Sequence, residues 1–114
     1  MTYQDQMRKG TTAVILLHLL AELGRPVHGY EVIKELQRRS EGGFDFKEGL
    51  VYPRLHELER QGYLRSYWQE SGEGRRRKYY EITDQGRQRL AEERREWRAF
   101  RSSVDALLGL DEAA

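Results

Sequence analysis

A β-hairpin pattern that lies between helical segments narrows the choice of folds for this chain more than any other part of its sequence. Residues 63–70 (YLRSYWQE) and 75–82 (RRRKYYEI) are rich in aromatic residues and partly alternate in polarity. Residues 71–74 (SGEG) predict the turn that joins the two strands. We expect the apolar side chains of the hairpin to cover helices: Leu64, Tyr80 and Ile82.

Two helical patterns come first along the chain. Residues 1–10 (MTYQDQMRKG) read as a short polar arm, after which Thr11 or Thr12 caps a helix, AVILLHLLAELG, that is apolar nearly all round and therefore buried. Residues 28–39 (HGYEVIKELQRR) predict a second helix with a polar outer face. Its inner stripe consists of Val32, Ile33 and Leu36. Residues 44–46 (FDF) predict a short extended link anchored by its two aromatic rings.

A third helix is predicted from Lys47 or Glu48 to Gln61, and Gly62 stops it. At about 100° per residue, one side of this helix faces inward: Val51, Leu55 and Leu58. The opposite side is expected to be exposed: Gly49, Pro53, His56 and Arg60. Because proline has no N–H, Pro53 is expected near the first turn, where the missing donor costs little.

Thr83 is expected to cap a last helix that runs from Asp84 to about Leu108, with Gly109 at its end. Its apolar residues follow a short coiled-coil-like seam: Leu90, Trp97, Phe100, Val104 and Leu107. These side chains either pack back onto their own domain or pair with a second subunit. Because a single helix of this length would leave much of the seam uncovered, we expect a homodimer.

Three helices, a hairpin and a long helix follow one another in the order of a winged helix. The fold class is therefore mainly α with a small β-hairpin, a winged helix-turn-helix plus a long C-terminal helix. We expect residues 1–83 to form a winged-helix DNA-binding domain with an N-terminal arm, and residues 84–114 to form a dimerisation helix. The second and third helices make the helix-turn-helix, and the hairpin is the wing.

The composition excludes several classes of protein. The 114 residues include no cysteine, which removes disulfide scaffolds, thiolate zinc sites and cysteine nucleophiles. The longest apolar run is too short to cross a bilayer, and residues 1–10 lack the apolar core of a signal peptide, so we expect a cytoplasmic protein. Twenty Lys and Arg residues nearly balance 19 Asp and Glu residues, so attraction to DNA must come from local charge.

The strongest local charge lies on the hairpin. Four consecutive cations stand at its tip and return strand: Arg75, Arg76, Arg77 and Lys78. They repel one another, but in contact with a phosphate backbone the cluster would gain binding affinity through the release of counterions. The alternative is that the cluster is only a solvated part of an edge strand, because charges prevent such a strand from pairing with another chain. After a helix-turn-helix we favour contact with DNA.

The third helix is expected to lie in the major groove of double-stranded DNA, with its N-terminal residues nearest the bases. Its predicted contacts are Tyr52, Pro53, Arg54 and His56. Tyr52 alternatively packs half-buried on the neighbouring helix, and Arg54 alternatively pairs with Glu57. Tyr30 and Lys34, near the start of the second helix, are further predicted DNA contacts, whereas His28 is expected to be a cap or turn residue.

Metal binding and catalysis are not expected. The three histidines, His18, His28 and His56, fall on three different helices without the spacing of a metal site, and His18 is expected to be a satisfied core histidine. No phosphate-cradling glycine loop follows a strand, and no carboxylate pair stands in an apolar segment. We therefore expect neither an enzyme nor a cofactor.

Three segments of the chain resemble the PadR family of bacterial transcription regulators: HGYE at 28–31, GLVYPRLHELE at 49–59 and GRRRKYYEIT at 74–83. The resemblance extends from about Gly10 to Leu108, and the single helix after the wing is similar to the smaller branch of the family. It implies a homodimeric winged-helix repressor that contacts DNA through Tyr52, Pro53 and the wing. The family usually has a small hydroxyl residue and a leucine where this chain has Leu50 and Val51.

Several members of that family respond to phenolic acids or planar aromatic drugs at the dimer interface. By resemblance, Trp97 and Phe100 offer such a surface by stacking, unless they are simply dimer core. The sequence thus predicts a sequence-specific repressor of transcription that binds a pseudo-palindromic operator as a homodimer and is released by a small aromatic ligand. The alternative is a winged-helix protein–protein interaction module without DNA binding, suggested by Leu50 and by three acids: Glu48, Glu57 and Glu59.

Overall fold

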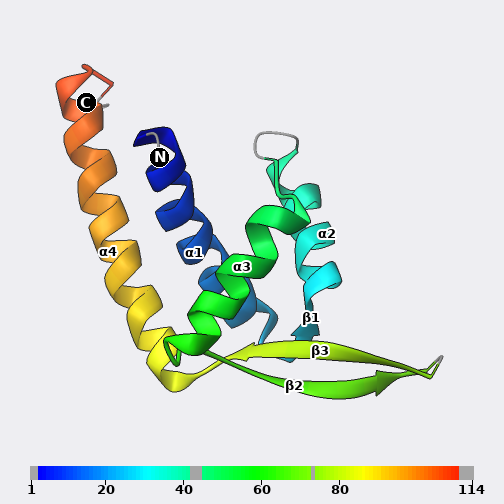
Figure 1. Cartoon of the computed structure of the whole chain (residues 1–114). Coiled ribbons are helices and arrows are strands. Elements are labelled where there is room, and N and C mark those ends of the chain that lie inside the picture. The colour runs from blue at the N-terminus through cyan, green and yellow to red at the C-terminus, as the bar shows by residue number, and fades with distance from the viewer. Residues whose placement is uncertain (1–2, 42–44, 73, 111–114) are drawn as a thin grey trace.

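The computed structural model describes residues 3–41, 45–72 and 74–110 and contains four helices and three strands within them (Figure 1). In chain order the elements are α1 (Tyr3–Leu23), β1 (Val27–His28), α2 (Gly29–Ser40), α3 (Glu48–Arg60), β2 (Leu64–Ser71), β3 (Arg75–Ile82) and α4 (Asp84–Leu107). The mainly helical class, the hairpin wing and the long last helix are all confirmed. The bounds of the hairpin strands match the predicted ones to within one residue.

The sheet has three antiparallel strands in the order β1-β3-β2, so the predicted hairpin gains one strand that the sequence pattern did not show. β1 pairs with β3 through Val27 opposite Tyr80 and His28 opposite Tyr79. A two-residue strand is too short to alternate visibly, and its partner lies about 50 residues further along the chain. His28, expected as the first residue of the second helix, instead ends this strand and caps α2.

The first helix begins earlier than the sequence suggested. α1 starts at Tyr3, so residues 3–10 of the polar segment that was predicted to be an arm are helical, and neither Thr11 nor Thr12 is a cap. The segment contains glutamine, methionine, arginine and lysine, which favour helix, and its single internal Gly10 is not enough to stop one. Polarity alone was therefore a poor sign of irregular structure.

One apolar core joins α1, α2, α3 and the sheet. Its fully buried members come from every layer and include Leu16, Leu20, Val32, Val51, Leu55 and Tyr80. The three hairpin residues expected to cover the helices are all buried. In the link after α2, Phe46 is buried as predicted, while Phe44 lies outside the described residues. His18 is not a core histidine, because its side chain is half exposed and pairs with Glu22.

α3 exposes the side that was predicted to be exposed, and Gly62 ends it with a positive φ of 86°. Pro53 was expected near the first turn, but it lies inside the helix as its sixth residue. Because proline cannot donate there, the Gly49 carbonyl loses its usual helical partner. That carbonyl lies on the exposed side of the helix, where water can replace the missing donor.

Thr83 caps α4 as predicted, and its Oγ1 accepts a hydrogen bond from the Gly86 N–H at 3.0 Å. Gly86 is buried against Tyr63, and a side chain there would overlap the Tyr63 carbonyl. α4 then runs beside α1, so that the tip of the wing and the far end of α4 lie at opposite corners of the molecule (Figure 1). The helix ends at Leu107, and Gly109 follows with a positive φ of 71°.

Candidate nucleic-acid interface

A cleft of about 720 Å³ lies between the wing, the N-terminal end of α2 and the middle of α3. It brings together seven of the ten residues that the sequence predicted to contact DNA: Tyr30, Tyr52, His56, Arg75, Arg76, Arg77 and Lys78. His28, Gly29, Trp68 and Tyr80 complete its lining. The other three predicted contacts, Lys34, Pro53 and Arg54, do not line the cleft. The two helices and the His28 cap supply hydroxyl and imidazole groups to the cleft, and the wing supplies its positive charge.

Tyr52 packs on the neighbouring helix, as one of its two predicted arrangements required, and it also lines the cleft. Its ring is half buried against Gly29 at the start of α2, where an added Cβ would stand only 2.9 Å from the ring atom Cζ and closer still to Cε1. Burial, with a smaller effect of Glu48, raises the pKa of the Tyr52 hydroxyl, so this group remains a proton donor. The ring therefore packs on the neighbouring helix while the residue lines the cleft.

Pro53 and His56 are exposed on α3, but Arg54 is half buried and does not pair with Glu57. Glu57 pairs with Arg60 instead. Nε of Arg54 is the buried side-chain nitrogen or oxygen that lacks a hydrogen-bond partner within the described part of the chain. The alternative arrangement, in which Arg54 pairs with Glu57, is therefore wrong, and the contact of Arg54 with DNA stays a prediction.

The four wing cations are not equivalent. Nζ of Lys78 lies 3.0 Å from Oε1 of Glu59, which ties the wing to α3. Nη1 of Arg77 lies 3.0 Å from Nε2 of His28. The Arg76 guanidinium stands over the ring of Trp68, 5.8 Å from its centroid. Lys78 is thus engaged within the fold, while Arg76 is exposed and lies over Trp68.

The tie between Lys78 and Glu59 also shows in their titration. Burial acts to raise the pKa of Glu59, but hydrogen bonds from Ser66 and Lys78 outweigh it and hold the pKa below its usual value. Ser66 donates to Oε2 of Glu59, so one carboxylate of α3 holds residues of both wing strands. This contact was not predicted, because it depends on how the wing folds back onto α3.

Trp68 lines the cleft but was not among the predicted site residues. It is 57% exposed, lines the cleft and pairs in register with Lys78 on the neighbouring strand. The alternation of β2 could have predicted this position, because Trp68 lies four residues after buried Leu64 and therefore on the same face of the strand. The cleft thus holds a flat apolar ring next to the positive charge of Arg76.

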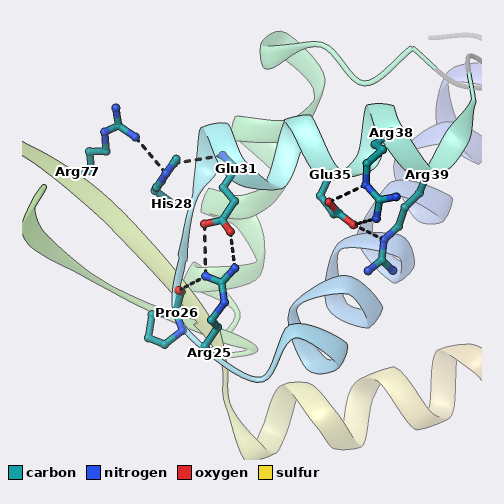
Figure 2. Close-up of polar contacts among 8 residues, drawn as sticks. All are labelled: Arg25, Pro26, His28, Glu31, Glu35, Arg38, Arg39 and Arg77. Atoms are coloured by element: carbon teal, nitrogen blue, oxygen red, sulfur yellow. Dashed lines mark hydrogen bonds and ion pairs between the residues drawn. The ribbon is translucent and has the colours of Figure 1, made fainter.

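The start of α2 carries several charged and aromatic groups. Tyr30 is half exposed and lines the cleft, and Nζ of Lys34 lies 5.3 Å from the centroid of its ring. Figure 2 shows His28 at this helix end, with Nδ1 accepting from the Glu31 N–H at 3.2 Å. The Glu31 carboxylate turns away from Arg77 and pairs with Arg25 (Figure 2). His28 is thus the cap that the sequence predicted.

The predicted dimer residues divide into two groups. Leu90 is only 7% exposed and belongs to the core of its own chain, which leaves it little surface for a partner. Trp97, Phe100 and Leu107 are 44%, 47% and 86% exposed, and Val104 is half buried. The rings of Trp97 and Phe100 lie 5.9 Å apart between centroids. The second half of α4 therefore presents an uncovered apolar seam.

Residues 3–41, 45–72 and 74–110 contain neither a candidate metal site nor a candidate membrane-spanning helix. No group of three His, Asp or Glu side chains in these segments could hold a metal ion. None of the helices in them is long and apolar enough to span a bilayer.

The helix-turn-helix, the three-stranded sheet with its basic hairpin wing, and the cleft between them define a winged-helix DNA-binding regulator. Residues 16–92 match the model of the Transcriptional regulator PadR-like family. The chain belongs to this family, and it is accordingly a transcriptional regulator and not an enzyme. The resemblance noted in its sequence motifs is thereby confirmed.

Known proteins of the same kind are similar over most of their length. The Transcriptional regulator Rv3488 of Mycobacterium tuberculosis is 39% identical over 90 residues, which cover 78% of this chain and 80% of that protein. A transcriptional regulator from Clostridium thermocellum superposes with a TM-score of 0.80 at 30% identity, covering 89% of this chain and 96% of that one. A PadR-like regulator from Bacillus cereus has a TM-score of 0.74 at 31% identity, with coverages of 90% and 96%.

Proposed function

We propose that this regulator is a homodimeric repressor that binds a pseudo-palindromic operator in the cytoplasm. The N-terminal half of α3 enters the major groove, and the wing follows the adjacent phosphate backbone. The observation that carries this proposal is the cleft, where hydroxyl and imidazole groups of α2 and α3 face the basic wing. A site of this composition can read base edges on one side and hold phosphates on the other.

The charge of the whole molecule adds little to this binding. The net charge is only +1, so long-range attraction to DNA is weak. Arg75, Arg76 and Arg77 concentrate positive charge on one strand, and such a local cluster gains affinity through counterion release. We therefore expect binding that depends on salt in proportion to a few close phosphate contacts.

The uncovered seam of α4 supports the proposed dimer. Trp97, Phe100 and Leu107 lie on one side of a helix that extends away from the wing. A two-fold pairing of this helix would place two copies of α3 on one face of a duplex. A dimer seated across an operator excludes other proteins from the same DNA, and we propose repression for this reason.

An aromatic effector is a further part of the proposal. Trp97 and Phe100 are close enough to make one aromatic surface, and a planar ligand could stack on it at the dimer seam. If the two rings are only dimer core, planar aromatic compounds should not change their fluorescence or the DNA affinity. A concentration-dependent quench of Trp97 together with release of DNA would support the effector site.

The test of the proposal is the salt dependence of DNA binding. The triple variant Arg75→Ala/Arg76→Ala/Arg77→Ala should bind a promoter fragment of its own gene less tightly, and the log–log salt slope should fall by about 0.9 for each phosphate that the variant no longer neutralises. Lys78→Ala is the matched control, because Lys78 is held by Glu59 and should change stability more than slope. A folded triple variant with the slope of the wild type would contradict the role of the wing.

The protein–protein alternative loses part of its support in the structure. Of the three acids that suggested it, Glu57 pairs with Arg60 and Glu59 with Lys78, so they do not make a free acidic surface. A gel shift against fragments of the native genome separates the two functions. A regulator of the proposed kind retards some fragments specifically, whereas an interaction module retards none.

A further inference from the structure

His28 stands between two hydrogen-bond donors. The backbone N–H of Glu31 points at Nδ1 from 3.2 Å, and Nη1 of Arg77 lies 3.0 Å from Nε2 on the other side of the ring (Figure 2). A neutral imidazole has one nitrogen that accepts and one that carries a hydrogen. His28 can therefore satisfy only one of these two donors.

The helix cap decides which nitrogen accepts. His28 caps α2 with extended backbone geometry, and without Nδ1 as acceptor the Glu31 N–H at the first turn would lose its partner. Burial, followed by the charge of Arg77, lowers the pKa of His28, so the ring is neutral near pH 7. The hydrogen then sits on Nε2 and faces the Arg77 guanidinium, which is also a donor.

Two donors 3.0 Å apart repel each other unless both can donate to a shared acceptor. We propose that the N–H at Nε2 of His28 and the guanidinium of Arg77 together clamp one phosphate group of the DNA backbone. This inference rests on the proposed function and extends it from the tip of the wing to β1 and the start of α2. His28 and Arg77 would then each donate a hydrogen bond to the same phosphate.

The surroundings of the pair suit an anion. Both residues line the cleft in which DNA is proposed to bind. The carboxylate of Glu31, which follows in α2, is paired with Arg25 and turns away from Arg77 (Figure 2). The ring of Tyr79 packs edge-on against His28, with centroids 5.6 Å apart, and holds the imidazole in this orientation.

The tautomer can be measured without DNA. A long-range ¹H–¹⁵N spectrum of the free protein at pH 7.5 should show Nδ1 of His28 unprotonated and the hydrogen on Nε2. The reverse tautomer would mean that Nε2 accepts from Arg77, and it would overturn the clamp. Addition of a duplex enriched by the wild-type protein from a random-sequence library should then shift the Nε2 resonance of His28.

Inorganic phosphate serves as a second probe in the same spectrum. We expect the duplex to shift His28 at concentrations where inorganic phosphate has no effect, because α3 and the wing hold the duplex in register. A shift by inorganic phosphate with none from the bound duplex would assign the pair to a free anion and overturn the assignment to DNA.

Two substitutions separate the cap from the clamp. His28→Asn keeps a short side-chain oxygen that can cap α2 but removes the donor at the Nε2 position. It should fold with wild-type stability and bind the enriched duplex about tenfold more weakly, as expected for one lost bond to a charged group. His28→Gln keeps a donor near that position but no cap, so it should lose stability and retain more affinity than His28→Asn.

The outcomes distinguish this inference from the proposed function. If the wild-type protein enriches no duplex, the proposed function fails. If the wild type binds tightly and His28→Asn binds equally well while Arg77→Ala is weakened, DNA binding stands and the clamp is wrong.

Discussion

Gly29 sets the distance between α2 and α3, because the ring of Tyr52 fills the space that a side chain would need. Gly29→Ala should displace this ring, lower the stability of the fold by about 1–3 kcal/mol through overpacking and weaken DNA binding. Denaturant unfolding and a gel shift measure the two effects. Gly49→Ala is the control, since a Cβ there meets nothing within 4 Å and the helix gains from alanine. Equal stability of both variants would contradict the close approach at Gly29.

His28 also makes stability depend on pH. Its pKa in the folded chain is lowered, first by burial and then by Arg77 and Arg25, against a partial opposing effect of Glu31. The unfolded chain therefore takes up a proton first as the pH falls through about 6.5, and the folded state loses stability from there down to the folded pKa. The free energy of unfolding should fall between pH 7.5 and 5.5.

The control for this pH dependence is His28→Asn, which removes the titrating group but can keep the cap. Its unfolding free energy, measured by urea titration over the same range, should fall less steeply than that of the wild type. Parallel curves for the two proteins would show that groups other than His28 account for the dependence.

Single residues were predictable where the neighbours in sequence decide their role. Thr83 and His28 act as caps because a cap needs only the next three residues. The pairing of Lys78 with Glu59 was not predictable, since it joins residues of two elements through the tertiary fold. For the same reason the cations of the wing looked alike in sequence and differ in the structure.

At the scale of the elements, the hairpin and the last helix were predicted almost to the residue. Their signals are local: alternation, a glycine-containing turn and a capping threonine. The start of α1 and the strand β1 were missed. β1 exists only because β3 offers it hydrogen bonds, and a pattern of two residues carries no period that could reveal it.

The contact between α3 and the wing is itself testable. Glu59→Gln removes the ion pair with Lys78 and weakens the bond from Ser66, both of which orient the wing. We expect a loss of about 1 kcal/mol in the free energy of unfolding, because the pair is partly shielded from water. Urea unfolding near pH 7 measures it, and Glu70→Gln on the exposed part of the wing should cost less. Equal losses of unfolding free energy in Glu59→Gln and Glu70→Gln would show that Glu59 does not hold the wing on α3.

At the scale of the whole molecule, the proposed dimer depends on α4. Phe100→Glu/Leu107→Glu places charges on the exposed seam and should shift the protein from dimer to monomer in sedimentation equilibrium. Ser102→Glu adds a charge to the opposite side of the same helix and should leave the dimer intact. Deletion of the residues after Arg95 should likewise yield a monomer or an insoluble chain. A double variant that still sediments as a stable dimer would place the interface elsewhere.

The overall balance of charge gave little indication of function. A net charge of +1 is unusual for a DNA-binding protein, yet the distribution of charge matters more than its sum. The cations on β3 stand beside a cleft, whereas several acids elsewhere are engaged by neighbouring arginines, as Glu35 is by Arg38 and Arg39 (Figure 2). Those hydrogen bonds lower the pKa of Glu35 to about 2.

A hydroxyl-radical footprint on a promoter fragment of the protein's own gene tests the homodimeric operator complex most directly. Two copies of α3 related by a two-fold axis should protect two symmetric half-sites whose centres lie about 34–36 Å, one helical turn, or a multiple of this apart. The triple arginine variant of the wing should lose the protected backbone positions at the outer edge of each half-site. A single unpaired patch of protection, or none at concentrations that saturate the fragment, would contradict the proposed complex.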